Sequence, residues 1–269
     1  MDDLLWMIRR KLIKMTKQTI NQIKEKLALI NNLDDTVFKT LSDDPRKGVQ
    51  HLLQTATARI KKRQLEKAEF QSRFKYERSF WHRGVNYVAG VDEVGRGPLA
   101  GPVVACATIL PRDFDLIQVN DSKQLTPEIR ARLAPQIKRE AISIGLGLVD
   151  NKGIDRLNIY EATRVAMKQA VNNLTQQPDE IIVDAMQIPV PIHQTRLIKG
   201  DAKSISVSAA SIVAKVYRDN LMDQYAQQYP EYDFRHNAGY GTAKHLSALK
   251  KYGATPIHRK TFAPIKNFL

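Results

Sequence analysis

The sequence predicts an α/β fold in which a sheet is covered by helices, with a more helical C-terminal part and a small helical extension at the N-terminus. From residue 85 onward, short apolar runs typical of strands alternate with segments of helical periodicity. Residues 1–84 contain almost no strand-like runs. We therefore expect two domains, a basic helical extension over residues 1–84 and an α/β domain over residues 85–269.

Two long helices are expected in the extension. Apolar residues recur at helical spacing over residues 16–30. The tetrapeptide at 42–45, Ser-Asp-Asp-Pro, is typical of a helix start, because capping residues are followed by a proline in the first turn. The helix that begins there is expected to continue as far as Phe74.

The α/β domain is expected to alternate strands and helices in the following order. The predicted strands cover residues 87–91, 103–110, 144–149, 180–183 and 196–198. The predicted helices cover residues 156–174, 207–228 and 242–252.

The charge balance favours a polyanionic partner. The chain has 42 Lys and Arg against 28 Asp and Glu, a net charge of +14, and its first 84 residues hold 19 of the basic and 10 of the acidic residues. Such a balance suits nucleic acid or an anionic membrane surface. The basic run at 59–63 is either a solvated helix face or a nucleic-acid contact.

Other features exclude several classes. A single cysteine, Cys106, excludes an intrachain disulfide and a cysteine-based zinc site, and its apolar surroundings at 103–107 predict a core residue. No apolar run reaches the length of about 18 residues that a membrane helix needs. Residues 1–17 lack the features of a signal peptide. We expect a cytoplasmic protein whose natural start is Met15, so that residues 1–14 are dispensable or lie upstream of it.

Four acidic residues stand at the ends of predicted strands. Asp92 and Glu93 end the first strand and Asp184 ends the fourth, while Asp201 follows the fifth. Strand ends form the rim of an α/β sheet, where ligand sites lie. Oxygen ligands of this kind suit Mg²⁺ or Mn²⁺ rather than zinc.

A group of carboxylates is electrostatically costly without cations, because each charge raises the pKa of its neighbours. A pair of cations about 4 Å apart would relieve the repulsion and clamp a phosphodiester. Adjacent strand residues face opposite sides, so Asp92 and Glu93 can serve one site only if the chain leaves the strand there. Gly95 and Gly97 favour such an exit. Taken singly, each acid is instead typical of a helix cap or a lysine partner.

The segment 89–104, AGVDEVGRGPLAGPVV, resembles the signature of ribonuclease HII. Later segments follow in the order of that family: NDSK at 120–123, VDA at 183–185, KGD at 199–201, SAASIVAK at 208–215, HNAGYGT at 236–242 and HRKTF at 258–262. The resemblance implies a ribonuclease H-like fold, with a mixed sheet flanked by helices, and a catalytic domain over residues 85–269. It also implies that the metal-binding catalytic carboxylates are Asp92, Glu93, Asp184 and Asp201.

The resemblance assigns substrate contacts as well. Gly95, Arg96 and Gly97 would recognise the ribonucleotide, because glycines let the backbone approach its 2′-hydroxyl, the group that distinguishes RNA from DNA. Tyr240 would pack against the deoxyribose that follows. Ser122 and Lys123 form a turn that is expected to contact a phosphate. Residues 208–214 are expected to pack a helix on the sheet. Lys215 and Arg218 either reach the duplex backbone or are solvated.

The implied activity is that of a monomeric endonuclease without a membrane partner. It would cut the RNA strand of RNA–DNA hybrids and cut 5′ of single ribonucleotides in duplex DNA, leaving a 5′-phosphate and a 3′-hydroxyl. A ribonuclease HIII-like nuclease or junction resolvase of the same fold is one alternative, and a non-catalytic duplex-binding protein is another. Arg96 and the strandless extension favour ribonuclease HII, since ribonuclease HIII carries lysine in the tripeptide and a β-rich platform. The long extension itself departs from a minimal family member.

Overall fold

The computed structural model describes residues 18–268, which belong to two compact units, Met1–Glu69 and Phe70–Leu269. The expected start at Met15, the expected dispensability of residues 1–14 and the beginning of the helix expected at residue 16 lie outside the described residues. Across residues 18–268, no helix is both long enough and apolar enough to cross a membrane.

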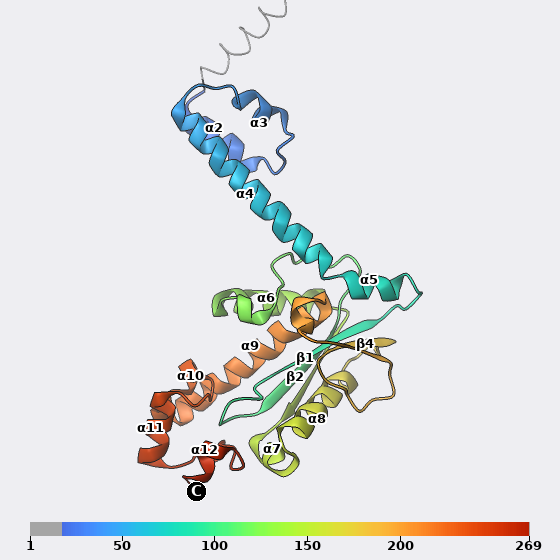
Figure 1. Ribbon diagram of the computed structural model, residues 1–269, viewed down its shortest axis with the longest axis vertical. Helices are drawn as coiled ribbons and strands as arrows, with labels where there is room; N and C mark the ends of the chain where they lie inside the picture. The colour runs from blue at the N-terminus through green and yellow to red at the C-terminus, as the bar shows by residue number, and fades with distance from the viewer. Residues whose placement is uncertain (1–17, 269) are drawn as a thin grey trace, which may run out of the picture. The chain divides into compact units, whose positions relative to one another are not determined.

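The first unit contains α2 (Ile20–Leu29), α3 (Thr36–Leu41) and most of α4 (Lys47–Ser72), whose last three residues belong to the second unit. Helix α2 begins at a capping box, in which the side chains of Thr19 and Gln22 each accept a hydrogen bond from the other residue's backbone N–H. The two expected helices are thus present, and α3 was not predicted (Figure 1). The apolar core of this unit contains Ile23, Leu27, Ile30, Leu41, Val49, Leu53, Ala56 and Ile60.

The basic run at 59–63 partly stabilises this unit. The Arg59 guanidinium donates to the backbone oxygens of Leu27, at 2.8 Å, and Ile30, at 2.6 Å, which satisfies carbonyl groups at the end of α2. Arg63 donates to the side chain of Asn31 at 3.1 Å. The two lysines between these arginines are exposed. Arg59 is therefore a structural residue, whereas Lys61, Lys62 and Arg63 are exposed, as a solvated helix face or a nucleic-acid contact requires.

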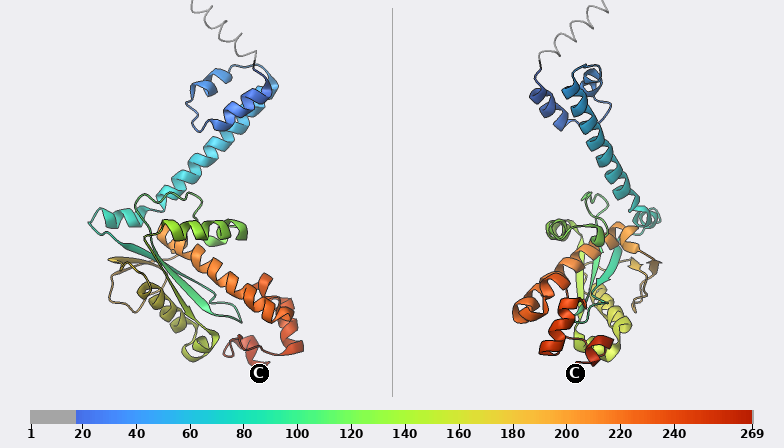
Figure 2. Two further views of the ribbon diagram at one scale, coloured as in Figure 1. Left: turned by 180° about the vertical axis from the view of Figure 1, so that it is seen from behind. Right: turned by 60° about the vertical axis from the view of Figure 1, so that its left-hand side comes forward.

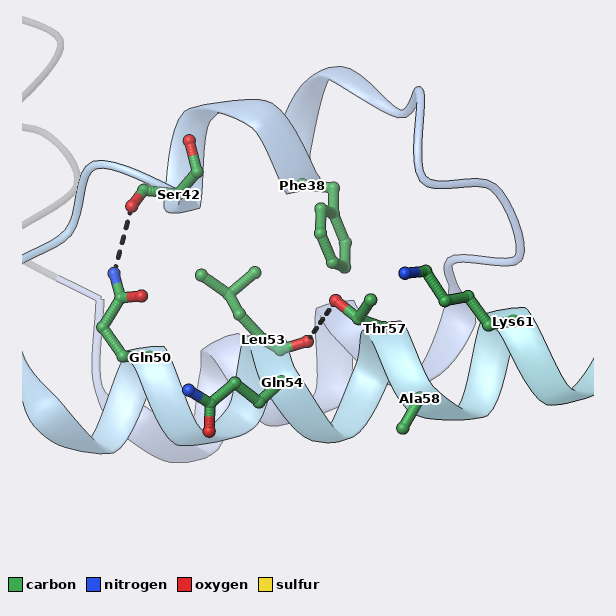
Figure 3. Close-up of a pocket in the computed structure, with 8 residues that line it drawn as sticks. All are labelled: Phe38, Ser42, Gln50, Leu53, Gln54, Thr57, Ala58 and Lys61. Atoms are coloured by element: carbon green, nitrogen blue, oxygen red, sulfur yellow. Dashed lines mark hydrogen bonds between the residues drawn. The ribbon is translucent and has the colours of Figure 1, made fainter.

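A shallow pocket lies between α3 and α4 (Figure 3). The Gln50 side chain closes one end by donating to the Ser42 carbonyl group at 3.0 Å. Lys61 stands at the other end, beside the Phe38 ring. The other lining residues are Leu53, Gln54, Thr57 and Ala58.

The second unit is built on a five-stranded sheet of order β3-β2-β1-β4-β5. The strands are β1 (Val88–Val94), β2 (Val103–Ile109), β3 (Ser143–Val149), β4 (Glu180–Asp184) and β5 (Gln194–Leu197). β2 pairs antiparallel with β1 and β3, whereas β4 pairs parallel with β1 and β5. The sheet is therefore mixed, as expected.

Helices cover both faces of this sheet (Figures 1 and 2). Helix α8 (Ile159–Asn172) packs on one face, after the shorter α7 (Asn151–Leu157). Helix α9 (Ile205–Gln228) packs on the other face and contacts α6 (Pro127–Glu140). Along β2, Val103 and alternate residues face α8 while the residues between them, Cys106 included, face α9. Cys106 is a core residue, as predicted.

Small residues bring these helices close to the sheet. A Cβ atom at Gly90 would overlap the backbone of α9, and one at Gly147 would overlap the carbonyl oxygen of Ala166 in α8. Every residue from Ser208 to Ala214 is buried. The segment 208–214 therefore packs a helix on the sheet, as predicted.

The predicted helix over 156–174 is two helices. Asn158 separates α7 from α8 with a φ of 67° and a ψ of 163°, a backbone conformation that residues with a side chain rarely adopt. Its side chain accepts hydrogen bonds from the backbone N–H groups of Tyr160 and Glu161 and so caps α8. Helical periodicity continues across this break, so the pattern alone did not reveal it.

The segment 70–81 belongs to the second unit, because its aromatic side chains lie in that unit's core. It contains helix α5 (Lys75–Trp81). Glu77 of this helix is buried, and its Oε1 accepts hydrogen bonds from the Ser204 hydroxyl, at 2.5 Å, and the Ser206 N–H, at 3.0 Å, where α9 begins. Burial raises the pKa of the Glu77 carboxyl.

A group of short helices completes the unit after α9: α10 (Phe234–Asn237), α11 (Ala243–Tyr252) and α12 (Ala263–Lys266). They enclose a small apolar core around Phe234 and Tyr232. This is the more helical C-terminal part that the sequence predicted (Figure 1).

Candidate active site

Two of the four acidic residues lie side by side at the centre of the sheet. β1 and β4 are parallel neighbours in which Val91 pairs with Val183. Asp92 and Asp184, the next residue on each strand, therefore come together at the carboxyl ends of these strands, on the face covered by α9. Asp201 follows in the short 3₁₀ turn Gly200–Ala202, where the N–H of Gly200 donates to Asp184 Oδ1 at 2.8 Å.

The backbone at Glu93 does not leave the strand as expected. β1 continues to Val94, with Glu93 paired to Ala105, so the expected exit from the strand at Asp92 and Glu93 is wrong. The antiparallel neighbour β2 keeps this segment hydrogen-bonded and extended. Glu93 consequently begins on the opposite side of the strand from Asp92. It nevertheless belongs electrostatically to the same group, since it raises the pKa of Asp92.

The group is strongly desolvated. Burial and the charges of Glu93 and Asp184 raise the pKa of Asp92 well above its ordinary value. Burial, partly offset by Arg96, raises the pKa of Glu93, and the charge of Asp184 adds to the rise. Burial and the charge of Asp201 raise the pKa of Asp184, against the hydrogen bond from Gly200. Asp92, Glu93 and Asp184 are therefore each destabilised in the ionised form by burial and by at least one neighbouring carboxylate, as their raised pKa values show.

A lysine partly balances these charges. Lys123 Nζ lies 3.0 Å from Asp201 Oδ2, and the lysine side chain is 79% exposed while that of Asp201 is 4% exposed. Asp121 Oδ1 accepts from the Lys123 N–H at 2.9 Å and so shapes the turn. Ser122 is buried, and its carbonyl group accepts from Arg130 at 2.8 Å. The turn at 120–123 is thus fixed beside the acidic group.

The acidic group offers oxygen ligands to a divalent cation. As the side chains stand in residues 18–268, no three acidic, histidine or cysteine groups are placed to hold an ion together. One oxygen of the group, Glu93 Oε2, is buried and has no hydrogen-bond partner among the described residues. The set offers oxygen ligands and carries excess buried negative charge, which suits a hard cation. The chemistry therefore fits Mg²⁺ or Mn²⁺, and binding needs side-chain rotation.

The tripeptide Gly95, Arg96 and Gly97 follows β1 directly, so it lies next to the acidic group. Gly95 has a φ of 91°, a conformation that favours glycine, while Arg96 and Gly97 are exposed. The Arg96 guanidinium is 3.5 Å from Glu93 Oε1.

Tyr240 reaches the same loop from the C-terminal part of the unit. A Cβ atom at Gly97 would lie 3.2 Å from Tyr240 Cε1, so the ring lies directly against this glycine. The ring is half exposed. The Tyr240 carbonyl group is 2.8 Å from His245 Nδ1, and His245 Nε2 is 2.9 Å from His258 Nε2, both imidazoles being buried. The tyrosine is therefore an accessible ring on a firmly held backbone.

Two arginines behind the tripeptide, Arg218 and Arg259, are buried, which the sequence did not predict. Arg218, expected to reach the duplex backbone or to be solvated, is 1% exposed and contacts backbone carbonyl groups, so that expectation is wrong. Arg259 is fully buried and was not singled out beyond its place in the segment HRKTF. Nothing in local periodicity predicts a buried charge whose partners are distant carbonyl groups. Lys215, its companion in the expectation, is half-buried and pairs with Asp219 at 2.5 Å.

The mixed sheet and its acidic strand ends define the class of ribonuclease H-like nucleases, whose fold family is metal-dependent. Residues 89–265 match the family model described as Ribonuclease HII, and residues 19–81 match a second model, the Ribonuclease HII N-terminal domain. A ribonuclease HII of Lactobacillus delbrueckii subsp. bulgaricus is 57% identical over 250 residues, which cover 93% of this chain and 97% of that protein. The chain belongs to the ribonuclease HII family and is an endoribonuclease of the type 2 ribonuclease H class.

Solved structures agree in fold. The crystal structure of ribonuclease H2 from Pyrococcus horikoshii OT3 is 31% identical with a TM-score of 0.58, over 68% of this chain and 96% of that one. A crystal structure of Bst-RNase HIII in complex with Mn²⁺ has a TM-score of 0.55 at 22% identity, over 69% of this chain and 70% of that one. The ribonuclease H-like fold is therefore confirmed. The extension, which the sequence suggested as a departure from the family, matches a family domain of its own over residues 19–81.

We expect Asp92→Asn to raise the melting temperature of the metal-free protein. The pKa of Asp92 is raised in the folded state, so the folded state binds protons more tightly than the unfolded state. The stability of the wild type therefore falls as pH rises from the ordinary aspartate pKa through the raised one, and this loss is smaller in the variant. The melting temperatures of both proteins in EDTA at about pH 5 and about pH 8 measure this difference. We expect the larger rise in melting temperature at the higher pH.

Asp113→Asn is the matched control, because Asp113 is exposed and lies outside the acidic group. This control is expected to melt like the wild type at both pH values. A lower melting temperature for Asp92→Asn at about pH 8 would contradict the electrostatic account.

Proposed function

We propose that this ribonuclease HII family member hydrolyses the RNA strand of RNA–DNA hybrids and also cuts on the 5′ side of single ribonucleotides embedded in duplex DNA. The cut leaves a 5′-phosphate on the ribonucleotide and a 3′-hydroxyl on the upstream DNA. The protein acts as a cytoplasmic monomer with Mg²⁺ or Mn²⁺. The observation that carries this proposal is the desolvated acidic group, which lies next to a glycine-rich loop and an exposed tyrosine ring.

The four carboxylates are proposed as both catalytic and metal-binding residues. When bound, two divalent cations would stabilise the charge on the attacking and leaving oxygens of the phosphodiester. Asp92 and Asp184 are the central ligands in this proposal, because each follows the last residue that β1 and β4 pair with one another and both share one face of the sheet. Glu93 contributes an oxygen that has no other described partner. Asp201 contributes from the following turn once Lys123 releases it.

The remaining residues bind the substrate in this proposal. Gly95, Arg96 and Gly97 read the ribose through backbone groups, which the exposure of Arg96 and Gly97 supports. Ser122 and Lys123 form the turn that meets a phosphate, and the exposed Lys123 ammonium supports this role. Tyr240 packs against the sugar after the ribonucleotide.

We also propose that the chain is organised as a basic extension over residues 1–84 and a catalytic domain over residues 85–269. The two family models, which cover residues 19–81 and 89–265, support this division. The compact units divide earlier, after Glu69, because residues 70–81 pack in the catalytic core. The exposed lysines of α4 supply positive charge to the extension.

A DNA duplex with one ribonucleotide and a 5′ label tests the proposed reaction. With Mg²⁺ or Mn²⁺ we expect a single cut 5′ of the ribonucleotide, and in EDTA none. Asp92→Asn and Asp184→Asn each remove a charged ligand without changing volume, so both should fold and lose about a thousandfold or more in rate. Asp201→Asn should be milder, because in this proposal Asp201 lies in the turn after the sheet and must leave Lys123 before it binds a cation.

The exposed Asp113→Asn variant should cleave like the wild type. Retention of about a tenth of the wild-type rate by both Asp92→Asn and Asp184→Asn would exclude the metal-ligand assignment. Binding without any cleavage in either cation would favour the non-catalytic alternative.

Tyr240→Ala should slow cleavage at an RNA–DNA junction more than cleavage within a continuous RNA tract. A ring packed face-on tolerates a deoxyribose but crowds an additional 2′-hydroxyl, so its loss removes the preference for a following DNA sugar. Tyr240→Phe should be mild, since the ring provides the packing. The ratio of kcat/KM on the two substrates measures the effect. Equal slowing of both would assign the ring to general positioning instead.

A further inference from the structure

Two buried guanidinium groups lie behind the proposed ribose-reading loop. Arg218, on α9, donates through Nε to the Pro102 carbonyl oxygen at 2.9 Å and through Nη2 to that of Ala100 at 3.1 Å. Its Nη1 donates to the Ala238 carbonyl oxygen at 2.9 Å. Since Ala238 lies two residues before Tyr240, this one side chain joins the segment after the tripeptide to the segment that carries the tyrosine.

Arg259 makes the equivalent contacts to the tripeptide itself. Its Nη2 donates to the Gly95 carbonyl oxygen at 2.5 Å, its Nη1 to that of Arg96 at 2.8 Å and its Nε to that of Gly101 at 2.9 Å. The backbone N–H of Arg259 donates to the Leu99 carbonyl group at 2.9 Å. The loop is therefore held at several successive carbonyl groups.

Burying two positive charges in this way does not by itself stabilise the fold. Among residues 18–268, neither arginine forms an ion pair with a carboxylate, so the two charges are met by carbonyl dipoles and, for Arg259, by the Phe262 ring at 5.1 Å. Burial lowers the pKa of Arg218 to about 10, and burial together with the charge of Arg218 lowers the pKa of Arg259 to about 9. Both remain charged at neutral pH. Apolar side chains of similar volume would avoid this desolvation.

The contacts determine which way the peptide groups of the loop point. Peptide bonds in the described residues are trans, so the C=O of one residue and the N–H of the next point in opposite directions. Because the carbonyl groups of Gly95 and Arg96 point at Arg259, the N–H groups of Arg96 and Gly97 point away from it. Neither N–H donates a hydrogen bond within residues 18–268, and both residues are exposed. Two oriented donors thus face outward.

The packing leaves little freedom for another orientation. A Cβ atom at Gly95 would overlap the Arg218 guanidinium, and one at Gly101 would lie 2.6 Å from the Met222 sulfur. The N–H of Leu99 also donates to the Gly239 carbonyl group at 2.8 Å, beside Tyr240. The loop and the tyrosine are therefore held in one geometry from behind.

We propose that Arg218 and Arg259 are positioning residues for ribonucleotide selection: they hold carbonyl groups inward so that the N–H groups of Arg96 and Gly97 face the ribose while Tyr240 stays against Gly97. The inference rests on the proposed function, in which this loop reads the 2′-hydroxyl. The arginines touch no substrate and act through the backbone. Their substitution should change selection for ribose rather than phosphate binding.

The test measures binding of two duplexes in EDTA, one with a single ribonucleotide and one of the same sequence in DNA only. The ratio of their Kd values is the ribose preference. Arg259→Lys keeps the charge but cannot bridge several carbonyl groups, and Arg259→Met keeps the approximate volume without the charge. In each folded variant we expect the preference to fall about threefold to tenfold towards one, with DNA binding nearly unchanged. Arg218→Lys should act similarly and also weaken the junction preference.

Arg59→Lys is the matched control, because Arg59 makes the same kind of contact to carbonyl groups in the first unit. It should keep the wild-type preference. A merely structural role would lower both affinities together and leave their ratio intact, and that result would overturn the inference. A preserved preference in both folded Arg259 variants would also overturn it. Absence of any preference in the wild type would overturn the ribose-reading part of the proposed function together with the inference.

Discussion

Repulsion between buried carboxylates is the constraint on which the site depends. Asp92 and Asp184 lie side by side on the adjacent strands β1 and β4, and Glu93 and Asp201 add their charges to the same desolvated edge. In the absence of cations, this group raises the pKa of its own members and opposes folding at neutral pH. The same repulsion is what a divalent cation would relieve, so instability of the metal-free site and affinity for metal have one physical origin.

The rest of the catalytic unit supports this arrangement. Glycine and other small residues let α8 and α9 approach the sheet closely, which fixes the strand ends without bulky side chains. Glu77 binds the beginning of α9, just after Asp201. On the substrate side, Arg218 and Arg259 place positive charge behind the glycine-rich loop. The tripeptide therefore follows a buried negative group directly in the chain and has buried positive groups at its carbonyl oxygens.

Much of the fold followed from the sequence, because strand alternation and helical periodicity are local properties. The five strands, the helices α4, α8, α9 and α11 and the placement of the acidic residues near strand ends were predicted, whereas α6 was not. The break at Asn158 was not predicted either, since it depends on one residue with a positive φ inside a continuous apolar pattern. The length of β1 was also misjudged, because pairing with β2 rather than the following glycines decides where it ends.

Contacts between residues that are far apart in the sequence were the main limit on predicting the site. Arg218 resembled a surface cation in the sequence, and only the fold shows that three distant carbonyl groups surround it. The same holds for residues 70–81, whose aromatic side chains complete a core built mostly from later segments. The family resemblance supplied the order of the motifs, whereas the structure supplied their contacts.

Calorimetric titration of Mn²⁺ into the metal-free protein tests the central electrostatic claim most directly. The titration is made in two buffers of different ionisation enthalpy, so that the protons released per cation are counted. Because burial and mutual repulsion raise the pKa values of Asp92, Glu93 and Asp184, Mn²⁺ binding should release more protons at about pH 6 than at about pH 8, and Asp92→Asn should reduce the release. No Mn²⁺ binding, or binding without proton release at both pH values, would contradict the account.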